Sequence, residues 1–251
     1  MFSNAQHLVN RARLPWLTGW LNRLQDALLP PLCLLCGAAG ASGRDLCAGC
    51  AGELPLNAPA CPCCALPLAA ESKGPCGLCL RHPPDFDRVF APFLYRYRPP
   101  VDYLILGLKF NNRLSHARLL GELLADALAA RAAGLPDCIV PVPLHPLRLR
   151  ERGFNQALEL ARAAARRFQV PLVPDGLRRI RHTTPQTGLD ARQRQTNLLG
   201  AFMLSRPLQG KRVVLVDDVI TTASTVAECA RTLRAGGVTD LEIWAVARAA
   251  A

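Results

Sequence analysis

The chain lacks any long apolar run, which excludes a membrane-spanning helix. Half of its 251 residues are hydrophobic, yet no stretch approaches the roughly 20 consecutive apolar residues that such a helix needs. The N-terminus also lacks a continuous apolar core followed by a small-residue cleavage site, so we expect no signal peptide and a cytoplasmic location. The apolar residues are instead expected to build the core of one or two domains.

Aromatic and acidic residues are also scarce. Aromatic residues make up 6% of the chain and form no stripe interleaved with basic residues, which argues against binding nucleic acid by base stacking. Residues 1–85 hold six Lys or Arg and five Asp or Glu, whereas residues 86–251 hold twenty-four and fourteen. This basic excess favours an anionic partner, either a polyphosphate or nucleic acid. A merely Arg-rich surface is the alternative.

Residues 1–30 are predicted to form an amphipathic helix. Leucines recur there at spacings of three and four residues, and the pattern stops at Pro30 and Pro31. One apolar stripe at this period is typical of a helix that packs on other protein elements. Its polar face is not strongly basic, so packing on the rest of the protein is favoured over a membrane surface.

What the chain does have is a dense group of cysteines, nine of its eleven falling between residues 33 and 79. Eight of them form four Cys-x-x-Cys pairs: Cys33 and Cys36, Cys47 and Cys50, Cys61 and Cys64, Cys76 and Cys79. Each pair can hold one metal from a tight turn, and two pairs supply the four sulfurs that tetrahedral zinc prefers. We therefore predict a small double zinc ribbon over residues 31–85, with two structural zinc ions.

Two alternatives remain open within this segment. Cys63 competes with Cys64, which is favoured only because it matches the spacing of the other pairs. The ribbons are also able to interleave, so that the first and third pairs share a metal. His82 is a possible replacement ligand, although a lone histidine in a Pro-rich linker is more often exposed.

The remaining residues, 86–251, predict an α/β domain. Residues 89–95 indicate an edge strand because of Pro92, residues 99–110 a helix, and residues 115–132 a second helix capped by Ser115. Residues 138–143 indicate a strand that runs into a loop containing Arg148, Arg150 and Arg152. Arginines at alternating positions cannot share one helix face, so we expect an extended segment in which all three converge on an anion.

The most informative stretch is residues 212–235. It predicts a buried parallel strand, two acids at the strand's end, a hydroxyl-rich loop and a helix that ends at Gly236 and Gly237. Asp217 and Asp218 suit sugar hydroxyls or a metal that bridges to phosphates. The loop and the positive end of the helix suit a phosphate. The loop residues are Thr221, Thr222, Ala223, Ser224 and Thr225.

This stretch resembles the phosphoribosyl-pyrophosphate (PRPP) motif of type I phosphoribosyltransferases, with Ala223 where that group usually has glycine. Residues 141–156 and 178–197, together with the cysteine pairs, narrow the resemblance to the ComF family, also called competence protein F or GntX-like. That resemblance covers about residues 28–247. It implies a type I phosphoribosyltransferase-like (Rossmann-like) parallel sheet flanked by helices, preceded by the double zinc ribbon.

The resemblance also implies roles for named residues. Asp217 and Asp218 would face the ribose hydroxyls, with Mg²⁺ bridging to pyrophosphate, and the loop of residues 221–225 would hold the 5′-phosphate. The arginines of residues 148–152 would contact pyrophosphate. A covering loop at residues 181–197 would bring Arg181 and Arg194, with His182 and Gln186, over the leaving group.

Two classes of function follow from these expectations. The first is a Mg²⁺-dependent phosphoribosyltransferase with an unidentified acceptor, involved in DNA uptake, natural competence or the handling of single-stranded DNA together with the uptake machinery. The second is a non-catalytic nucleic-acid-binding protein or PRPP sensor that keeps the same fold. No residue stands out as a dedicated base for a nucleophile, so the sequence leaves this choice open.

Overall fold

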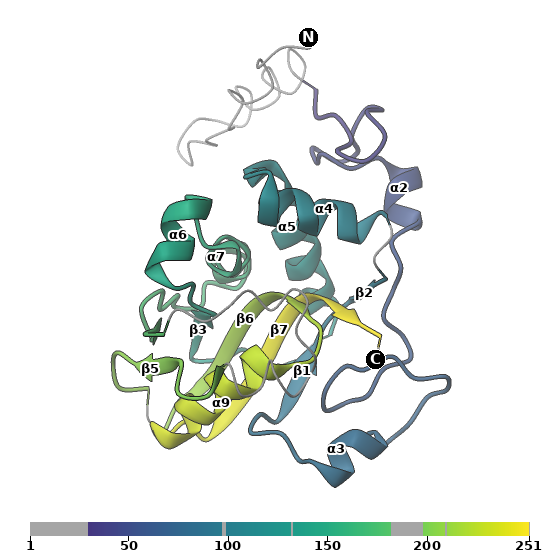
Figure 1. The fold of residues 1–251 in the computed structure, drawn as a ribbon. Helices are drawn as coiled ribbons and strands as arrows, with labels where there is room; N and C mark the ends of the chain where they lie inside the picture. The colour runs from purple at the N-terminus through teal and green to yellow at the C-terminus, as the bar shows by residue number, and fades with distance from the viewer. Residues whose placement is uncertain (1–29, 97–98, 132, 182–197, 209, 251) are drawn as a thin grey trace.

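The fold is built around a parallel β-sheet that carries helices on both faces (Figure 1). The structure is a computed structural model that describes residues 30–96, 99–131, 133–181, 198–208 and 210–250. Residues 1–29, where most of the predicted N-terminal helix falls, lie outside the described part. Among the described residues, no helix combines the length and the apolar character that crossing a membrane would require.

The sheet has the order β1-β7-β6-β3, and β2 also pairs with β7. Its strands are β1 (Arg88–Phe90), β2 (Phe93–Tyr95), β3 (Cys138–Pro141), β6 (Arg212–Ile220) and β7 (Asp240–Ala249). All pairings in this sheet are parallel, which confirms the predicted α/β architecture. The edge strand expected near residues 89–95 exists, but it is divided into β1 and β2 around Ala91 and Pro92 because proline cannot donate to the ladder.

Helices cover the two faces of the sheet unequally. On one face α4 (Val101–Phe110), α5 (Leu114–Ala130) and α7 (Gln156–Phe168) share a core with Val214, Val216 and Trp244. On the other face α9 (Ser224–Ala235) packs against Val213, Leu215 and Ile243. Successive residues of β6 therefore belong alternately to the cores on the two faces of the sheet, as expected for a strand that is buried on both sides.

Helix α5 is correctly predicted, but its cap is not Ser115. The helix begins at Leu114, its N-cap is Arg113, and no side chain caps it. Asn112 precedes this start at φ 51°, so a left-handed turn leads the chain out of α4 and places Ser115 inside the helix.

The two cysteine-rich units contact different faces of the sheet. The first, which contains α2 (Ala48–Gly52), packs with the core of α4 and α5 through Cys33, Leu46 and Leu54. An ion pair of 2.5 Å between Arg44 and Asp126 of α5 adds to this contact. The second unit, which contains α3 (Gly77–Arg81), packs with the core beneath α9. The two units are therefore separate in space as well as in sequence.

A small antiparallel pair, which sequence reasoning missed, lies beside the main sheet. It consists of β4 (Leu177–Arg179) and β5 (Phe202–Leu204). These strands are short and only partly buried, so they lack the apolar run that identifies a central strand. They flank residues 182–197, which lie outside the described part of the chain.

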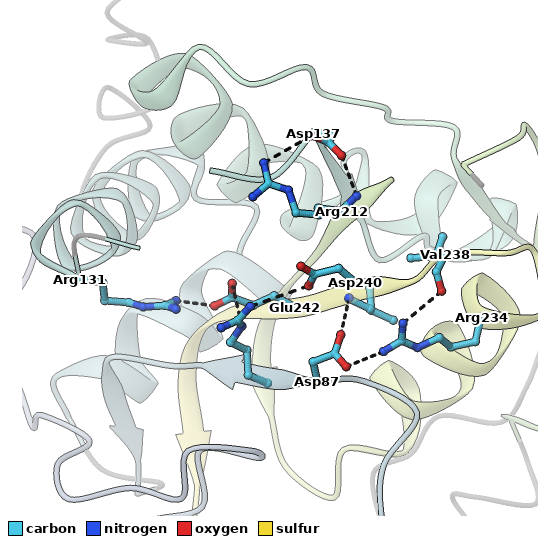
Figure 2. Close-up of polar contacts among 10 residues, drawn as sticks. Asp87, Arg131, Asp137, Arg212, Arg234, Val238, Asp240 and Glu242 are labelled. Atoms are coloured by element: carbon cyan, nitrogen blue, oxygen red, sulfur yellow. Dashed lines mark hydrogen bonds and ion pairs between the residues drawn. The ribbon is translucent and has the colours of Figure 1, made fainter. Parts of the chain in front are cut away.

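Ion pairs close the amino-terminal end of the sheet (Figure 2). The buried carboxylate of Glu242 accepts a hydrogen bond of 2.5 Å from Arg131 and lies 3.6 Å from Arg88. Asp137 accepts from the backbone of Arg212 at 2.8 Å, which joins the starts of β3 and β6. Asp87 likewise binds Arg234 of α9 and the backbone of Leu241. These contacts join the starts of β3, β6 and β7 to one another and to the ends of α5 and α9.

Candidate active site and metal centres

The acid pair of β6 lies where the neighbouring strand stops. Strand β3 pairs with β6 only as far as Pro141 opposite Val216, so Asp217 and Asp218 extend beyond it. On the other side β6 continues to pair with β7 as far as Ile220. The two acids therefore lie at the carboxyl end of the sheet, where ligands bind in open α/β folds.

Asp218 is buried at 4% exposure and faces α4 and α7. Its Oδ1 lies 2.9 Å from the ammonium of Lys109, in the last turn of α4. Its Oδ2 accepts a hydrogen bond of 3.3 Å from the amide of Gln156, the first residue of α7. The carbonyl oxygen of that amide is buried and has no partner among the described residues. It is a hydrogen-bond acceptor held beside the acid.

Asp217 faces the opposite side of the strand, toward α9 and β4. Burial, and next the charge of Asp218, raise the pKa of Asp217 to about 7, while Lys109 and Arg179 oppose the shift. Adjacent residues of a strand point to opposite faces, so the two acids have different neighbours. Asp217 is thus able to change its protonation near neutral pH.

The arginine segment is helical, which corrects the extended loop predicted from the sequence. Helix α6 spans Pro146–Arg152, with Pro146 in its first turn and Gly153 at φ 77° as its C-cap. Proline at a helix start and glycine at its end are standard helix signals, and here they outweigh the alternation of arginines. In a helix, positions 148 and 152 share a side and position 150 does not. Arg150 is indeed exposed, while Arg148 and Arg152 are half-buried.

The segment after α6 is fixed to the sheet by Asn155. Its side chain accepts from the backbone of Ala157 as the N-cap of α7 and donates to the carbonyl of Val142 at 3.0 Å. One amide therefore starts the helix and ties it to the end of β3. This double contact places Gln156 beside Asp218.

Three basic side chains interact with the two acids, Lys109 and Arg152 with Asp218 and Arg179 with Asp217, and Arg148 acts in turn on both arginines. Burial lowers the pKa of Arg152, and the charge of Asp218 opposes that shift. Burial also lowers the pKa of Arg179, where Asp217 opposes the shift and Arg148 adds to it. The cations are thus electrostatically coupled to one another and, except for Arg148, to the acids. Such a cluster favours a ligand that carries several negative charges.

The loop after β6 has the conformation that a phosphate loop needs. Ala223 has φ 62° and ψ 3°, the left-handed region in which glycine is favoured. It serves as the N-cap of α9, and no side-chain hydrogen bond caps the helix. The hydroxyls of Thr222 and Ser224 lie 2.9 Å apart. The first backbone N–H groups of a helix have no acceptor within the helix, so a helix start such as this one suits an anion.

Of the remaining predicted site residues, Arg181 lies within the described part of the chain and three others do not. Arg181 is exposed and donates to the carbonyl of Leu199 at 2.5 Å, a contact that places it beside the start of β5. Arg194, His182 and Gln186 lie outside the described residues.

Sequence reasoning missed Lys109 and Arg179 as site residues and gave Gln156 no specific role. Lys109 ends an amphipathic helix, so nothing local distinguishes it from a solvated lysine. For Arg179 a signal existed, since it falls in residues 178–197, which the family resemblance already singled out.

The eight paired cysteines form two tetrads, with all sulfurs of a tetrad within 4.8 Å of one another. The first holds Cys33, Cys36, Cys47 and Cys50, and the second holds Cys61, Cys64, Cys76 and Cys79. The pairs therefore combine in consecutive order, and Cys64 rather than Cys63 belongs to the second tetrad. His82 is exposed and belongs to neither tetrad.

The tetrads fit zinc in both geometry and chemistry. A tetrahedral ion about 2.3 Å from each sulfur sets the sulfurs about 3.8 Å apart. The sulfurs of Cys36 and Cys47 lie 3.7 Å apart, and so do those of Cys64 and Cys76. Although burial alone would raise it, backbone N–H donors lower the pKa of Cys33 to about 6 and that of Cys61 to about 7. Neighbouring thiols raise the pKa of Cys50, and burial together with neighbouring thiols raises the pKa of Cys64 and of Cys79. Zinc binding would therefore have to release protons from those sulfurs, as it does in structural zinc sites.

Known protein families match both the cysteine-rich part and the C-terminal part of the chain. Residues 24–80 match the family model described as a double zinc ribbon domain, and residues 155–251 match the phosphoribosyl transferase domain. The DNA utilization protein YhgH of Escherichia coli K12 is 40% identical over 225 residues, covering 88% of this chain and 98% of the relative. Competence protein F of Haemophilus influenzae is 36% identical over 225 residues, covering 86% and 96%.

Solved structures give a weaker likeness. An adenine phosphoribosyltransferase from Thermoanaerobacter pseudethanolicus aligns with 53% of this chain and 69% of its own, at 23% identity and a TM-score of 0.34. A TM-score this low adds no support of its own. The fold class therefore rests on the matched domain and on the parallel sheet with its flanking helices.

Proposed function

This chain belongs to the ComF family, and we propose that its C-terminal domain binds PRPP or a closely related phosphoribosyl diphosphate together with Mg²⁺. The observation that carries this proposal is the continuous unit of β6, the acid pair, the left-handed loop and the uncapped start of α9. It offers carboxylates for sugar hydroxyls and backbone N–H groups for a terminal phosphate, a few residues apart.

The basic cluster supports a diphosphate rather than a single phosphate. Arg152 of α6 interacts electrostatically with Asp218 and Arg179 of β4 with Asp217, and Arg148 of α6 acts on both arginines. Guanidinium groups bind phosphate oxygens bidentately, and they do so more strongly where they have lost part of their water. We assign the diphosphate to this cluster and the 5′-phosphate to residues 221–225.

Asp217 and Asp218 are the groups that would hold Mg²⁺, which prefers oxygen ligands and is usually bound by one or two carboxylates plus substrate phosphates. When bound, the ion would neutralise charge that develops on the departing diphosphate. Gln156 would orient Asp218 and offer its unpaired carbonyl to a ligand hydroxyl.

We further propose that the site transfers the phosphoribosyl group to an acceptor whose identity is open. In such a transfer the bond from the anomeric carbon to diphosphate breaks and a bond to the acceptor forms, and the acceptor loses a proton. Arg148, Arg152 and Arg179 would stabilise the diphosphate leaving group by electrostatic attraction. The helix-anchored site would supply the positioning.

The names of the relatives favour a role in DNA use. Proteins named for DNA utilization and for competence align with 88% and 86% of this chain. We propose that this protein likewise acts on internalised DNA in the cytoplasm, and that its basic C-terminal part contacts single-stranded DNA through phosphates. Binding of that kind weakens steeply with salt, and a flat salt response would count against it.

A binding protein without transfer is the second candidate. The ion pair between Lys109 and Asp218 favours it, because the protein itself already neutralises one acid of the pair. A PRPP sensor or a nucleic-acid-binding protein needs the ligand site but not turnover.

The binding proposal is tested by calorimetry with PRPP, with and without Mg²⁺. The double variant Asp217→Asn with Asp218→Asn should abolish Mg²⁺-dependent binding, and unchanged binding would refute the site. Transfer is tested by incubating protein, PRPP and Mg²⁺ with a metabolite extract. A new product that forms together with pyrophosphate, and only with wild-type protein, would establish the enzyme. Its absence, with PRPP binding intact, would favour the sensor.

A further inference from the structure

A buried arginine connects the phosphate loop with the second cysteine tetrad. Arg248, near the end of β7, is only 4% exposed. Its guanidinium donates to the carbonyls of Ile220 at 3.0 Å, Thr221 at 2.5 Å and Ala249 at 2.8 Å. Its Nε donates to the carbonyl of Cys64 at 3.2 Å. One side chain therefore joins the end of β6, the first loop residue and a cysteine of the second tetrad.

These contacts determine where the loop's backbone points. In a trans peptide the N–H is directed opposite to the carbonyl. Arg248 holds the carbonyls of Ile220 and Thr221, so the N–H groups of Thr221 and Thr222 are directed away from the guanidinium. They are thereby presented on the other side of the loop, as phosphate binding requires.

The charge of the tetrad explains why an arginine is tolerated at this depth. Four thiolates around a divalent metal leave two negative charges, and a buried cation needs such a partner. Burial lowers the pKa of Arg248, and Cys64, Cys76, Cys79 and Cys61 oppose that shift. The second unit also shares one apolar core with Ile220, against which Ala223 packs.

The first tetrad has no comparable connection among the described residues. Its unit packs on α5 through Arg44, Asp45 and Arg118 and belongs to the core of the opposite face. The second tetrad is therefore linked to the phosphate loop and the first to α5, although both are built from the same Cys-x-x-Cys pairs.

We propose that Arg248 is a positioning residue for the phosphate loop, and that the second metal-bound tetrad, unlike the first, is a structural part of the phosphate site. The proposal rests on the proposed function, because it concerns the same loop. It predicts that loss of metal from the second tetrad loosens residues 221–225, whereas loss from the first does not.

The test compares full-length variants by zinc content, ligand binding and hydrogen exchange. Cys64→Ser and its matched control Cys36→Ser should each reduce zinc from two ions to one per chain. Only Cys64→Ser should weaken PRPP and ribose 5-phosphate binding at least tenfold and speed exchange of the Ala227 amide, which closes the loop by donating to the carbonyl of Ala223. Equal effects of the two variants on these readouts would overturn the proposal.

Arg248 is tested separately, because loss of a zinc ligand can itself unfold the ribbon. Arg248→Lys keeps the charge, but its single nitrogen cannot reach the Cys64 carbonyl and the loop carbonyls together, as Nε and one Nη of the arginine do. We expect two zinc ions, faster exchange of the Ala227 amide, and binding of both ligands weakened at least fivefold. Wild-type exchange and affinity in this variant would refute the positioning role. If wild-type protein binds neither ligand, the proposed function fails, and the exchange comparison still decides whether Arg248 and the second tetrad order the loop.

Discussion

The ammonium of Lys109 lies 2.9 Å from Oδ1 of Asp218. This contact joins α4 to the acid pair across a sequence separation that no local pattern reveals. It also means that one carboxylate of the proposed Mg²⁺ site already has a cation. Ligand binding must therefore either displace Lys109 from Asp218 or include it as a contact to the diphosphate.

Replacing Lys109 distinguishes these two roles. If the ammonium competes with Mg²⁺, Lys109→Gln should lower the Mg²⁺ concentration that gives half-maximal PRPP binding severalfold, because Asp218 is freed. If the ammonium instead binds the diphosphate, affinity should fall about tenfold even at saturating Mg²⁺, since a charged hydrogen bond contributes about 1.5–3 kcal/mol. Calorimetry over a Mg²⁺ series separates the outcomes. The exposed Lys211→Gln, at the opposite end of β6, is the control.

Helix α6 gives a second prediction, in which neighbouring arginines differ. Arg148→Ala should weaken PRPP binding about tenfold, because it removes about 1.4 kcal/mol of charged hydrogen bonding. Arg150→Ala should change affinity less than twofold, because that side chain is exposed on the other side of the helix. Alanine suits a helix, so both variants keep α6. Equal losses in the two would mean that the segment is extended when ligand binds.

Asp217 gives a prediction about pH. Its pKa is raised from 3.8 to about 7, so the folded protein holds a proton that the unfolded chain releases. That stability is fully present below about pH 4 and is lost as pH rises through 7. Asp217→Asn does not titrate, so its stability relative to wild type should increase by about 1 kcal/mol from pH 6 to pH 8.

Urea unfolding of the two proteins at both pH values measures this difference. Asp218→Asn is the contrasting variant, because it removes the partner of Lys109. We expect it to lower stability by about 1–3 kcal/mol, as for other partly buried charges left without a partner. A constant difference between Asp217→Asn and wild type over this pH range would show that Asp217 does not titrate there.

The sequence predicted the parts of the site that depend on contiguous residues. Strand β6, its acids and the loop before α9 follow one another, so their periods and turn residues identify them locally. The cysteine pairs were equally clear in spacing. What the sequence left open was which pairs combine, and the structure answers this because each unit closes on itself against a different face of the sheet.

The sequence could not show contacts that tertiary packing creates. Lys109, Arg179 and Arg248 reach the site from three separate elements. Lys109 and Arg248 resemble ordinary basic residues in their own segments, and Arg179 was marked only by the family resemblance of residues 178–197. The helix at residues 146–152 was a different failure, because Pro146 and Gly153 marked its ends and the spacing of the arginines was given more weight. Which residue pairs with a charge depends on tertiary packing, whereas the ends of a helix can be predicted from the local sequence.

Ala223 gives the last prediction, because its backbone has the left-handed conformation at φ 62°. This conformation costs a residue with a Cβ about 1–2 kcal/mol, and glycine avoids that cost. Ala223→Gly should therefore raise stability by about 1 kcal/mol or leave it unchanged, since glycine also loses more entropy on folding.

The control for this variant is Ala227→Gly, one turn further along α9. There the backbone is helical, so glycine should lower stability by about 1 kcal/mol. Thermal unfolding of the two variants compares the same substitution in two backbone conformations. If Ala223→Gly destabilises the protein as much as Ala227→Gly does, then the loop does not adopt the left-handed turn in solution, and the assignment of residues 221–225 to a phosphate would lose its geometric basis.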